Sequence, residues 1–491
     1  MKLSYKLLSM SAAVAMSTGL LYGVTTSTNL PINQKAVHAE SASKEIIFQA
    51  KSGFDAKDYI KSIGGSIEQE VDLINGYIAR VPADRLDQVK AQNGITNVSE
   101  SHRVESTTQK IGEDNVIGKA LGQRNTHNEL IKATNVQYTG TGVTVAVLDS
   151  GVGAINELNV TKSVAINPDA TTTTDLYGHG THVAGIISGD SIHTGVAPNT
   201  NIISVKLGTD GGYVDEVDLL LGLQWVFDYK DEYNIKVVNL SVSSTISQSY
   251  LDNPISAAVE QLWLNGVIVV TAAGNDQYNQ SDINYAPAND PFVITVGALD
   301  GEGEYSASLT KLASWSKFGV TPEGVTKPEL NAPGVDIVSY LSSETAILAK
   351  EHPEAVYNNN YIEMSGTSMA APVITGAIAL LLEANPDLTP NQIKYLLTQT
   401  AQPTATAGSN IIDVEKAIGL AKNKDYLNNL NLSNYNNFEQ SQYINPSGNT
   451  VDYSKLSWHS LEWLKLSWHN VDWAKLSWKS QWDSIGQSLN N

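Results

Sequence analysis

The chain has 491 residues, enough for a full catalytic domain with accessory segments, and its 42% of hydrophobic residues is ordinary for a globular protein. A formal net charge of −20 argues against nucleic acid and anionic membrane surfaces as partners. The sequence contains no cysteine, which excludes disulfides, thiolate metal sites and a cysteine nucleophile.

Residues 1–39 are predicted to be a secretory signal peptide. Lys2 and Lys6 precede an apolar run from Leu7 to Val24. Val37-His38-Ala39 has small residues at the two positions that signal peptidase recognises before its cleavage site. An uncleaved membrane anchor is the alternative interpretation of the same pattern.

Residues 44–107 are predicted to form a small separate unit. Their apolar residues repeat every two residues in some stretches, which predicts strands, and with the helical period in others, which predicts helices. The resulting order β-α-β-β-α-β is typical of a ferredoxin-like α+β unit. So short a segment buries little apolar surface, so the unit is expected to be marginally stable unless it docks on a partner. Residues 108–128 are polar and are interpreted as an exposed, cleavable linker.

Residues 129–422 alternate between β-branched runs and helical patterns, which predicts an α/β domain with a parallel sheet covered by helices on both faces. Such sheets carry their chemistry beyond the carboxyl ends of the strands. The predicted strands are 143–148, 202–206, 236–240, 267–272 and 292–296, and the predicted helices are 181–188, 214–228, 254–265 and 369–382.

Two segments of unusual composition follow. Residues 423–450 are rich in asparagine and are predicted to be a flexible linker. Residues 451–491 repeat Leu-Ser-Trp every ten residues, a spacing that suits neither a helix nor a strand. Tryptophan favours boundaries between apolar and wet regions, so this tail is either an interfacial or cell-surface binding strip or a strip folded back onto the catalytic domain.

Polar residues with catalytic potential stand at the ends of two predicted strands. Asp149 ends a strongly apolar strand, where an acid is costly unless it is partnered, although alone it would equally suit a cap or a metal ligand. Asn275 follows a glycine at the end of another strand, and its amide suits an oxyanion donor or simply a turn.

Two further candidates stand where loops lead into helices. His179 begins the motif His-Gly-Thr-His, but there is no HExxH pattern, so His182 is interpreted as a packed, hydrogen-bonded histidine rather than a zinc ligand. Ser368 leaves a glycine turn at the start of a helix without a polar face. A lone serine in that place is most often a helix cap.

Together, the order Asp149, His179, Asn275, Ser368 and the motifs around these residues resemble the subtilisin-like serine peptidases. The resemblance covers roughly residues 130–422, and residues 44–107 resemble the family's inhibitory propeptide. It implies that Ser368 attacks the peptide carbonyl, that His179 transfers the proton and that Asp149 orients His179. Asn275 and the Ser368 backbone N–H would hold the oxyanion.

The resemblance also implies where a peptide substrate binds. Extended backbone on two sides pairs with it as added strands, here at Gly211 and Gly212 and at Ser241, Val242 and Ser243. The family commonly has glycine where this chain has Ser243. The segment between Gly185 and Gly195 is shorter than in relatives that bind calcium there, so that calcium site is not carried over. Residues 341–360 are an insertion that either shapes the cleft or is inert surface, and the second interpretation is favoured.

The leading hypothesis is therefore a secreted serine endopeptidase of protein or peptide substrates, made as a zymogen that cuts itself within about residues 100–128 and is inhibited by its own propeptide. The chemistry requires no cofactor and no metal ligand is assigned; structural calcium stays open. The rival hypothesis is a surface-binding protein whose Trp-rich tail carries the function on a peptidase scaffold.

Overall fold

The computed structural model describes residues 43–111, 126–190, 195–276, 278–301, 306–432 and residue 441. The predicted signal peptide at 1–39 and the Trp-rich tail at 451–491 lie outside these ranges.

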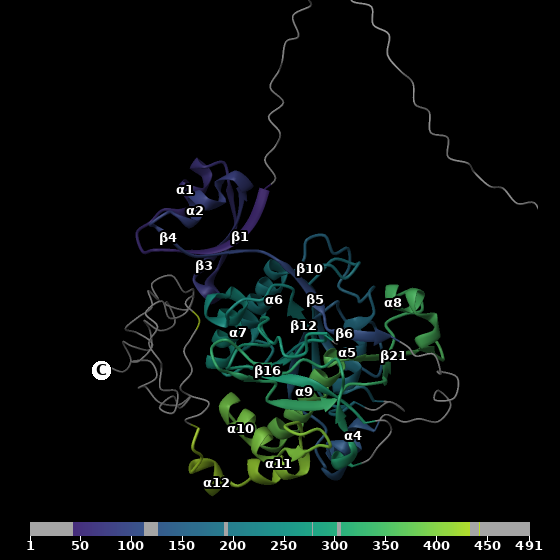
Figure 1. Ribbon diagram of the computed structural model, residues 1–491. Helices are drawn as coiled ribbons and strands as arrows, with labels where there is room; N and C mark the ends of the chain where they lie inside the picture. The colour runs from purple at the N-terminus through teal and green to yellow at the C-terminus, as the bar shows by residue number, and fades with distance from the viewer. Residues whose placement is uncertain are drawn as a thin grey trace, which may run out of the picture. The chain divides into compact units, whose positions relative to one another are not determined.

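Residues 43–100 form an antiparallel sheet with strand order β2-β3-β1-β4, and two helices pack against it (Figure 1). Phe48, Ile60 and Val89 are among the buried side chains that join sheet and helices into one core. The expected ferredoxin-like α+β unit is confirmed. Its elements are β1 (Ser43–Ala50), α1 (Ala56–Ser62), β2 (Ser66–Val71), β3 (Gly76–Pro82), α2 (Leu86–Lys90) and β4 (Ile95–Glu100).

The larger domain is built on a sheet with strand order β15-β14-β13-β11-β7-β9-β8, and β18 pairs with β14 beyond this path. All pairings are parallel except that of β14 with β15. The strands are β7 (Thr144–Asp149), β8 (Val160–Ala165), β9 (Asn201–Lys206), β11 (Ile235–Leu240), β13 (Ile268–Ala272), β14 (Ile294–Asp300), β15 (Lys311–Leu312) and β18 (Leu330–Pro333).

Helices cover both faces of this sheet, because its central strands are apolar on both sides. On β7, Val145 and Val147 join the hydrophobic cluster that contains α5 and α9, whereas Ala146 and Leu148 join the cluster that contains α6 and α7. The predicted α/β architecture is confirmed. The main helices are α5 (His179–Ser188), α6 (Glu216–Tyr229), α7 (Pro254–Leu264), α9 (Thr367–Ala384), α10 (Pro390–Thr400) and α11 (Val414–Ala421).

Helix α9 is the central helix of this domain. Every residue from Thr367 to Leu382 is buried. Pro372 lies inside the helix rather than in its first turn, so it cannot donate to Ser368 O, which instead accepts a hydrogen bond from Ser241 Oγ at 3.0 Å. Among the described residues α9 is the one helix long and apolar enough to cross a membrane, but it lies inside the protein core. Its lack of a polar face is therefore explained by packing on all sides.

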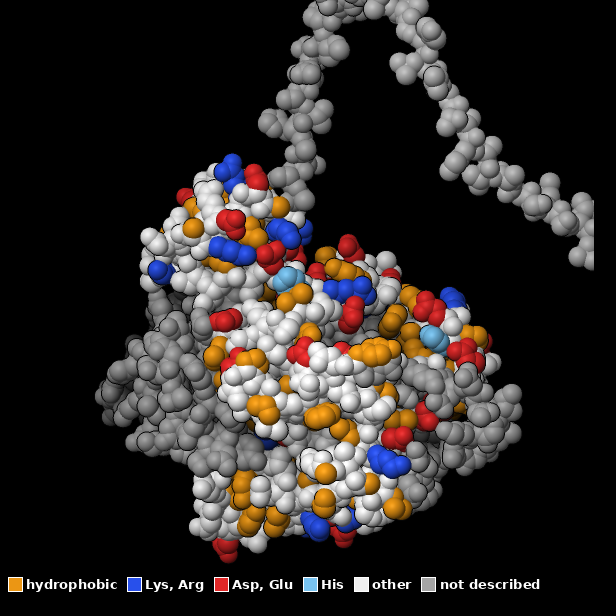
Figure 2. Space-filling view, in the orientation of Figure 1, with side chains coloured by type: hydrophobic (Ala, Val, Ile, Leu, Met, Phe, Trp, Pro, Cys, Tyr) orange, Lys and Arg blue, Asp and Glu red, His pale blue; other side chains and the backbone are white. Residues whose placement is uncertain are grey.

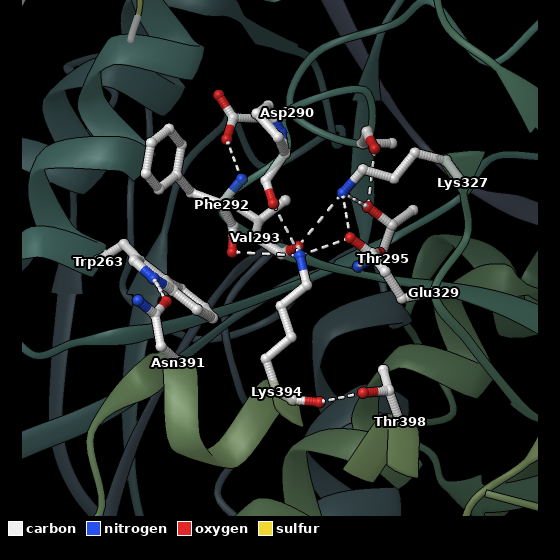
Figure 3. Close-up of polar contacts among 12 residues, drawn as sticks. Trp263, Asp290, Phe292, Val293, Thr295, Lys327, Glu329, Asn391, Lys394 and Thr398 are labelled. Atoms are coloured by element: carbon white, nitrogen blue, oxygen red, sulfur yellow. Dashed lines mark hydrogen bonds and ion pairs between the residues drawn. The ribbon is translucent and has the colours of Figure 1, made fainter. Parts of the chain in front are cut away.

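A group of buried charges connects α10 to the sheet. The Lys394 ammonium approaches Glu329, which Lys327 also contacts, and it donates to the carbonyl oxygens of Pro291 and Val293 (Figure 3). Lys394 is 2% exposed, so these contacts replace its water shell.

Three segments have more structure than the sequence predicts. The expected exposed linker at 108–128 begins as strand β6 (Thr108–Ile111) and ends in helix α4 (His127–Leu130), whose His127 is buried, and its residues 112–125 lie outside the described ranges. The expected linker at 423–450 begins with helix α12 (Lys424–Asn428), and Ser441 is buried with its backbone N–H on both Glu260 carboxylate oxygens. The insertion at 341–360 forms helix α8 (Ile347–Glu351) and strand β20 (Val356–Tyr357). The backbone N–H of Ile347 in α8 donates to Leu176 O, in the loop that leads to His179.

The visible surface of the domain carries hydrophobic side chains in small scattered groups, and charged side chains of both signs are interspersed on the small N-terminal unit (Figure 2). This pattern is typical of a water-exposed surface.

Candidate active site

Asp149 and His179 meet at the carboxyl end of the sheet. Asp149 is the last residue of β7, His179 is the first residue of α5, and Asp149 Oδ1 lies 2.7 Å from His179 Nδ1. Burial alone would lower the pKa of His179, but the adjacent Asp149 carboxylate more than compensates, so the net pKa is raised above 6.5. The pair is therefore arranged to stabilise a protonated imidazole.

Glycine at position 180 allows helix α5 to start this close to β7. A Cβ at Gly180 would lie 2.2 Å from the Gly151 carbonyl oxygen and 3.0 Å from the Asp149 Cβ. Gly151 itself has a φ of +105°, a conformation that other residues rarely adopt. The two glycines thus bring acid and base within hydrogen-bond distance.

Asp175 holds the loop before His179, and the sequence analysis did not identify it. Its fully buried carboxylate accepts hydrogen bonds from Ser150 Oγ, from the N–H groups of Tyr177 and Gly178, and from both the N–H and Oγ of Thr181. Burial raises the pKa of Asp175, and the hydrogen bonds from Thr181, Gly178 and Ser150 oppose that rise. The available signal was a carboxylate in the short polar segment between a strand and the His-Gly-Thr-His motif.

His182 lies on the same helix but faces another strand. Its Nε2 is 3.0 Å from the Ile337 carbonyl oxygen, and the side chain is buried. Among the described residues no group of His, Asp and Glu is arranged to hold a metal ion. His182 is thus a packed, hydrogen-bonded histidine.

Ser368 and Asn275 converge on a single carbonyl oxygen. Thr107 O accepts the Ser368 backbone N–H at 3.2 Å and Asn275 Nδ2 at 2.5 Å. The amide of Asn275 is oriented by Thr367, whose N–H and Oγ both donate to Asn275 Oδ1. Two donors aimed at one carbonyl oxygen are the arrangement that an oxyanion hole requires, and here the carbonyl belongs to the chain's own backbone.

The segment that supplies this carbonyl crosses the site as an added strand. Strand β5 (Arg103–Ser106) pairs antiparallel with β12 (Val242–Ser244) on one side and with β10 (Val214–Asp215) on the other. The Thr107 N–H then donates to Ser241 O at 3.3 Å. Backbone pairing on both sides is the mode by which a sheet edge binds an extended peptide.

The residues predicted to bind substrate lie on both sides of β5. Val242 and Ser243 are in β12 and Ser241 precedes it. Gly211 and Gly212 form the turn before β10 rather than the paired strand, and Gly212 has a φ of +80°. Strand β10 begins after these glycines, because their turn reverses the chain direction and places Val214 and Asp215 alongside β5.

Beyond Thr107 the same segment continues as β6 (Thr108–Ile111), which pairs antiparallel with β21 (Tyr361–Gly366). A Cβ on Gly366 would lie 2.4 Å from Thr107 O and 3.0 Å from the Thr108 Cα. Glycine at 366 therefore allows an extended chain to pass directly over the start of α9.

The hydroxyl of Ser368 does not contact His179. Ser368 Oγ donates to Ser241 O at 3.0 Å and lies 2.8 Å from Thr107 Oγ1, and His179 Nε2 has no hydrogen-bond partner among the described residues. The structure thus brings together Asp149 with His179, and Ser368 with Asn275. It does not show the hydrogen bond between Ser368 and His179.

Comparison with known proteins shows the family. The model of the subtilase family matches residues 140–433. This chain belongs to the subtilase family. The subtilase is 32% identical to subtilisin DY of Bacillus licheniformis over 300 residues, which cover 59% of this chain and 96% of that protein. It is 34% identical to the serine protease AprX of Bacillus subtilis (strain 168) over 283 residues, 55% of this chain and 64% of AprX.

A solved structure extends the likeness beyond the catalytic domain. Fervidolysin from Fervidobacterium pennivorans, described as a keratinolytic enzyme related to subtilisin, aligns with 78% of this subtilase and 62% of its own chain, with a TM-score of 0.59 and 25% identity. These relatives identify the subtilase as a serine-type endopeptidase, for which proteins or peptides are the substrates.

Proposed function

We propose that this subtilase is a secreted, self-processing zymogen in which the Thr107–Thr108 peptide bond is the first bond that the enzyme cuts. The observation that carries the proposal is the Thr107 carbonyl oxygen, which accepts hydrogen bonds from both Ser368 N–H and Asn275 Nδ2. A substrate carbonyl must occupy this position for charge on its oxygen to be stabilised during attack.

In the proposed mechanism, Ser368 Oγ first turns from Ser241 O towards His179 Nε2, which has no partner among the described residues. His179 removes the hydroxyl proton as Oγ bonds to the Thr107 carbonyl carbon, and Asp149 stabilises the imidazolium. The tetrahedral intermediate expels the Thr108 amine, which receives the proton from His179. A water molecule then attacks the Thr107 ester carbon while His179 removes one of its protons, and the second tetrahedral intermediate breaks the bond to Ser368 Oγ, which receives that proton from His179 and leaves Thr107 with a free carboxyl group.

All groups in this mechanism belong to the chain itself. Each donor and acceptor named is a side chain or backbone group, so we propose that the chemistry needs no cofactor. Calcium in a structural role is a separate question that the mechanism does not involve.

The same contacts support an inhibitory role for residues 44–107 after the cut. Ile47, Leu73 and Ile78 of this unit join the hydrophobic cluster of helices α6 and α7, and the Leu73 N–H donates to Gln224 Oε1 at 2.7 Å. With β5 still paired on both edges, the cleaved unit would remain as a bound product. We propose that it blocks the cleft until it is released or degraded.

Secretion is the second part of the proposal. It depends on the basic and apolar pattern of residues 1–39. The surface-binding alternative depends on residues 451–491, which lie outside the described ranges, and no observation favours it.

The test is N-terminal sequencing of the purified protein and of the Ser368→Ala variant. We expect the wild-type protein to yield a mature chain that begins at Thr108 and a fragment that ends at Thr107, and we expect Ser368→Ala to stay uncut. Ser365→Ala is the matched control. Ser365 lies three positions before Ser368 in the sequence, and its hydroxyl contacts Asp336 rather than the catalytic residues. Efficient processing of Ser368→Ala, or a first cut at another bond, would contradict the proposal.

A further inference from the structure

Two hydrogen bonds hold the hydroxyl of Ser368, and neither of them leads to His179. Ser368 Oγ donates to Ser241 O at 3.0 Å and lies 2.8 Å from Thr107 Oγ1. A serine hydroxyl has a single hydrogen to donate. Because that hydrogen is directed to Ser241 O, the Thr107 hydroxyl is the donor in the second contact. The two bonds therefore form a chain from Thr107 through Ser368 to Ser241 O.

This chain of hydrogen bonds opposes the attack of Ser368 on the Thr107 carbonyl. The attack requires the Ser368 hydrogen to be on His179 Nε2, whereas here it is on Ser241 O. Hydrogen bonds in a chain polarise and strengthen one another, so donation from Thr107 makes the bond from Ser368 to Ser241 O harder to break. The same donation also engages a lone pair of the oxygen that has to attack.

The surroundings keep the chain intact. Ser368 is fully buried and Thr107 is 7% exposed, so water does not compete for either hydroxyl. The position of Ser241 is fixed, because its Oγ donates to Ser368 O at 3.0 Å and accepts from Asn239 Nδ2 at 3.1 Å. The backbone of Thr107 is fixed by its own N–H on Ser241 O and by the pairing of β5 on both edges. A β-branched side chain on a fixed backbone has little rotational freedom, so the Thr107 hydroxyl stays directed at Ser368.

We infer that the Thr107 hydroxyl makes an autoinhibitory contact, which slows the cut at its own carbonyl by holding Ser368 away from His179. The inference rests on the proposed cut between Thr107 and Thr108, and it adds a regulatory role for the side chain at the cut. While the cleaved N-terminal unit stays bound, the same hydroxyl continues to hold Ser368. Any bound segment with a residue that lacks a hydroxyl at this position would leave Ser368 freer to turn to His179.

The test compares self-cleavage in full-length chains that differ at residue 107. Each chain is refolded at about pH 5, where His179 is protonated and cannot act as a base, and a jump to about pH 8 then starts the reaction. Thr107→Val replaces the hydroxyl with a methyl group of similar size. We expect it to raise the first-order rate of the cut about threefold to tenfold, the factor that corresponds to one neutral hydrogen bond. Thr107→Ala should raise the rate in the same way, whereas Thr107→Ser keeps the hydroxyl and should stay within about twofold of wild type.

Thr108→Val is the matched control, because it makes the same change on the other side of the bond. The Thr108 hydroxyl has no hydrogen-bond partner among the described residues, so its removal should leave the rate unchanged. The direction of the change at residue 107 separates two roles. If the Thr107 hydroxyl served only to bind the segment, its removal would lower the rate of the cut rather than raise it. Labelling of the final product with a fluorophosphonate measures how much of each variant has folded.

The two proposals fail in different ways. Rates for Thr107→Val and Thr107→Ala that equal or fall below the wild-type rate, with a normal yield of labelled enzyme, would overturn this inference. An equal increase in Thr108→Val would also overturn it. A wild-type chain whose first cut lies at another bond would instead refute the proposed function.

Discussion

The buried lysine of α10 offers a sharp test of how this domain is held together. In Lys394→Met the apolar stem is retained while the ammonium is removed. Glu329 keeps Lys327 at 2.8 Å, and Val293 O keeps the Lys327 ammonium at 3.2 Å, whereas Pro291 O loses its ammonium donor (Figure 3). The variant thus removes the Lys394 donor from the carbonyl oxygens of Pro291 and, at 3.5 Å, Phe292, and it leaves Glu329 with one of its two lysine partners.

The expected cost follows from these losses. Removing one partner from a buried ion pair costs about 3 to 5 kcal/mol, and the remaining Lys327 places this site at the lower end, at about 3 kcal/mol. Burial lowers the pKa of Lys394 to about 8, even though Glu329 raises it. The cluster as a whole therefore adds little stability, yet its members are costly to remove singly.

The assay is urea unfolding of the mature enzyme after inactivation by a fluorophosphonate, which prevents self-digestion. A loss of about 3 kcal/mol lowers the urea midpoint by about 1 M if the m-value is about 3 kcal/mol/M. Lys416→Met is a matched control: Lys416 also shares an acid, Asp413, with a second lysine, but its side chain is 60% exposed. It should cost at most about 1 kcal/mol. Equal midpoints for the two variants would refute this reasoning.

The remaining predictions concern catalysis and release of the N-terminal unit. Asn275→Ala should lower kcat by two to three orders of magnitude with little change in KM, a cost of about 3 to 4 kcal/mol taken from the matching asparagine of subtilisin; near-normal turnover would exclude Asn275 from the oxyanion hole. Because His179 acts as a base only when neutral and its pKa is raised above 6.5 by Asp149, kcat/KM should fall as pH falls through that raised value, and a pH profile without an acidic limb would contradict this role. With the N-terminal unit in place, burial raises the pKa of Glu216 to about 7, and the Glu216 carboxylate accepts the His102 N–H while the Glu216 N–H donates to His102 O. Release of the cleaved unit should expose Glu216 and lower its pKa towards 4.5. Formation of the complex would therefore take up a proton, and the complex should weaken as the pH rises from 4.5 to about 7. Glu216→Gln should flatten this dependence, measured as the rate at which activity appears in processed protein, and an unchanged pH dependence would exclude Glu216.

Local patterns in the sequence predicted the central strands of the sheet and several main helices, but they did not predict β8, β18, α10 or α11. The apolar run before Asp149 predicts strand 143–148, and β7 is Thr144–Asp149; the pattern at 254–265 predicts a helix, and α7 is Pro254–Leu264. These predictions succeed because hydrophobic periodicity reports directly on the faces that an element buries. The α12 helix within the predicted linker was missed because asparagine-rich composition gives no such period.

The site was predicted in part. The motifs identify Asp149, His179, Asn275 and Ser368, since each is attached to a glycine turn at a strand or helix end. Asp175, which is buried and accepts hydrogen bonds from five donors, carries no motif of its own, and its importance appears only when Ser150, Gly178 and Thr181 surround it. Its role depends on convergence of loops, which no local pattern encodes.

By itself the sequence determined which segments become strands and helices, because side-chain periodicity is a local property, and which residue types are available for acyl transfer. Only the tertiary structure decided that the carbonyl oxygen of Thr107, 261 positions before Ser368, accepts hydrogen bonds from the Ser368 N–H and from Asn275, and that Lys317 and Tyr285 form a cation–π contact. Such contacts depend on how whole elements dock, and docking is set by the packing of two hydrophobic clusters rather than by any short stretch of chain.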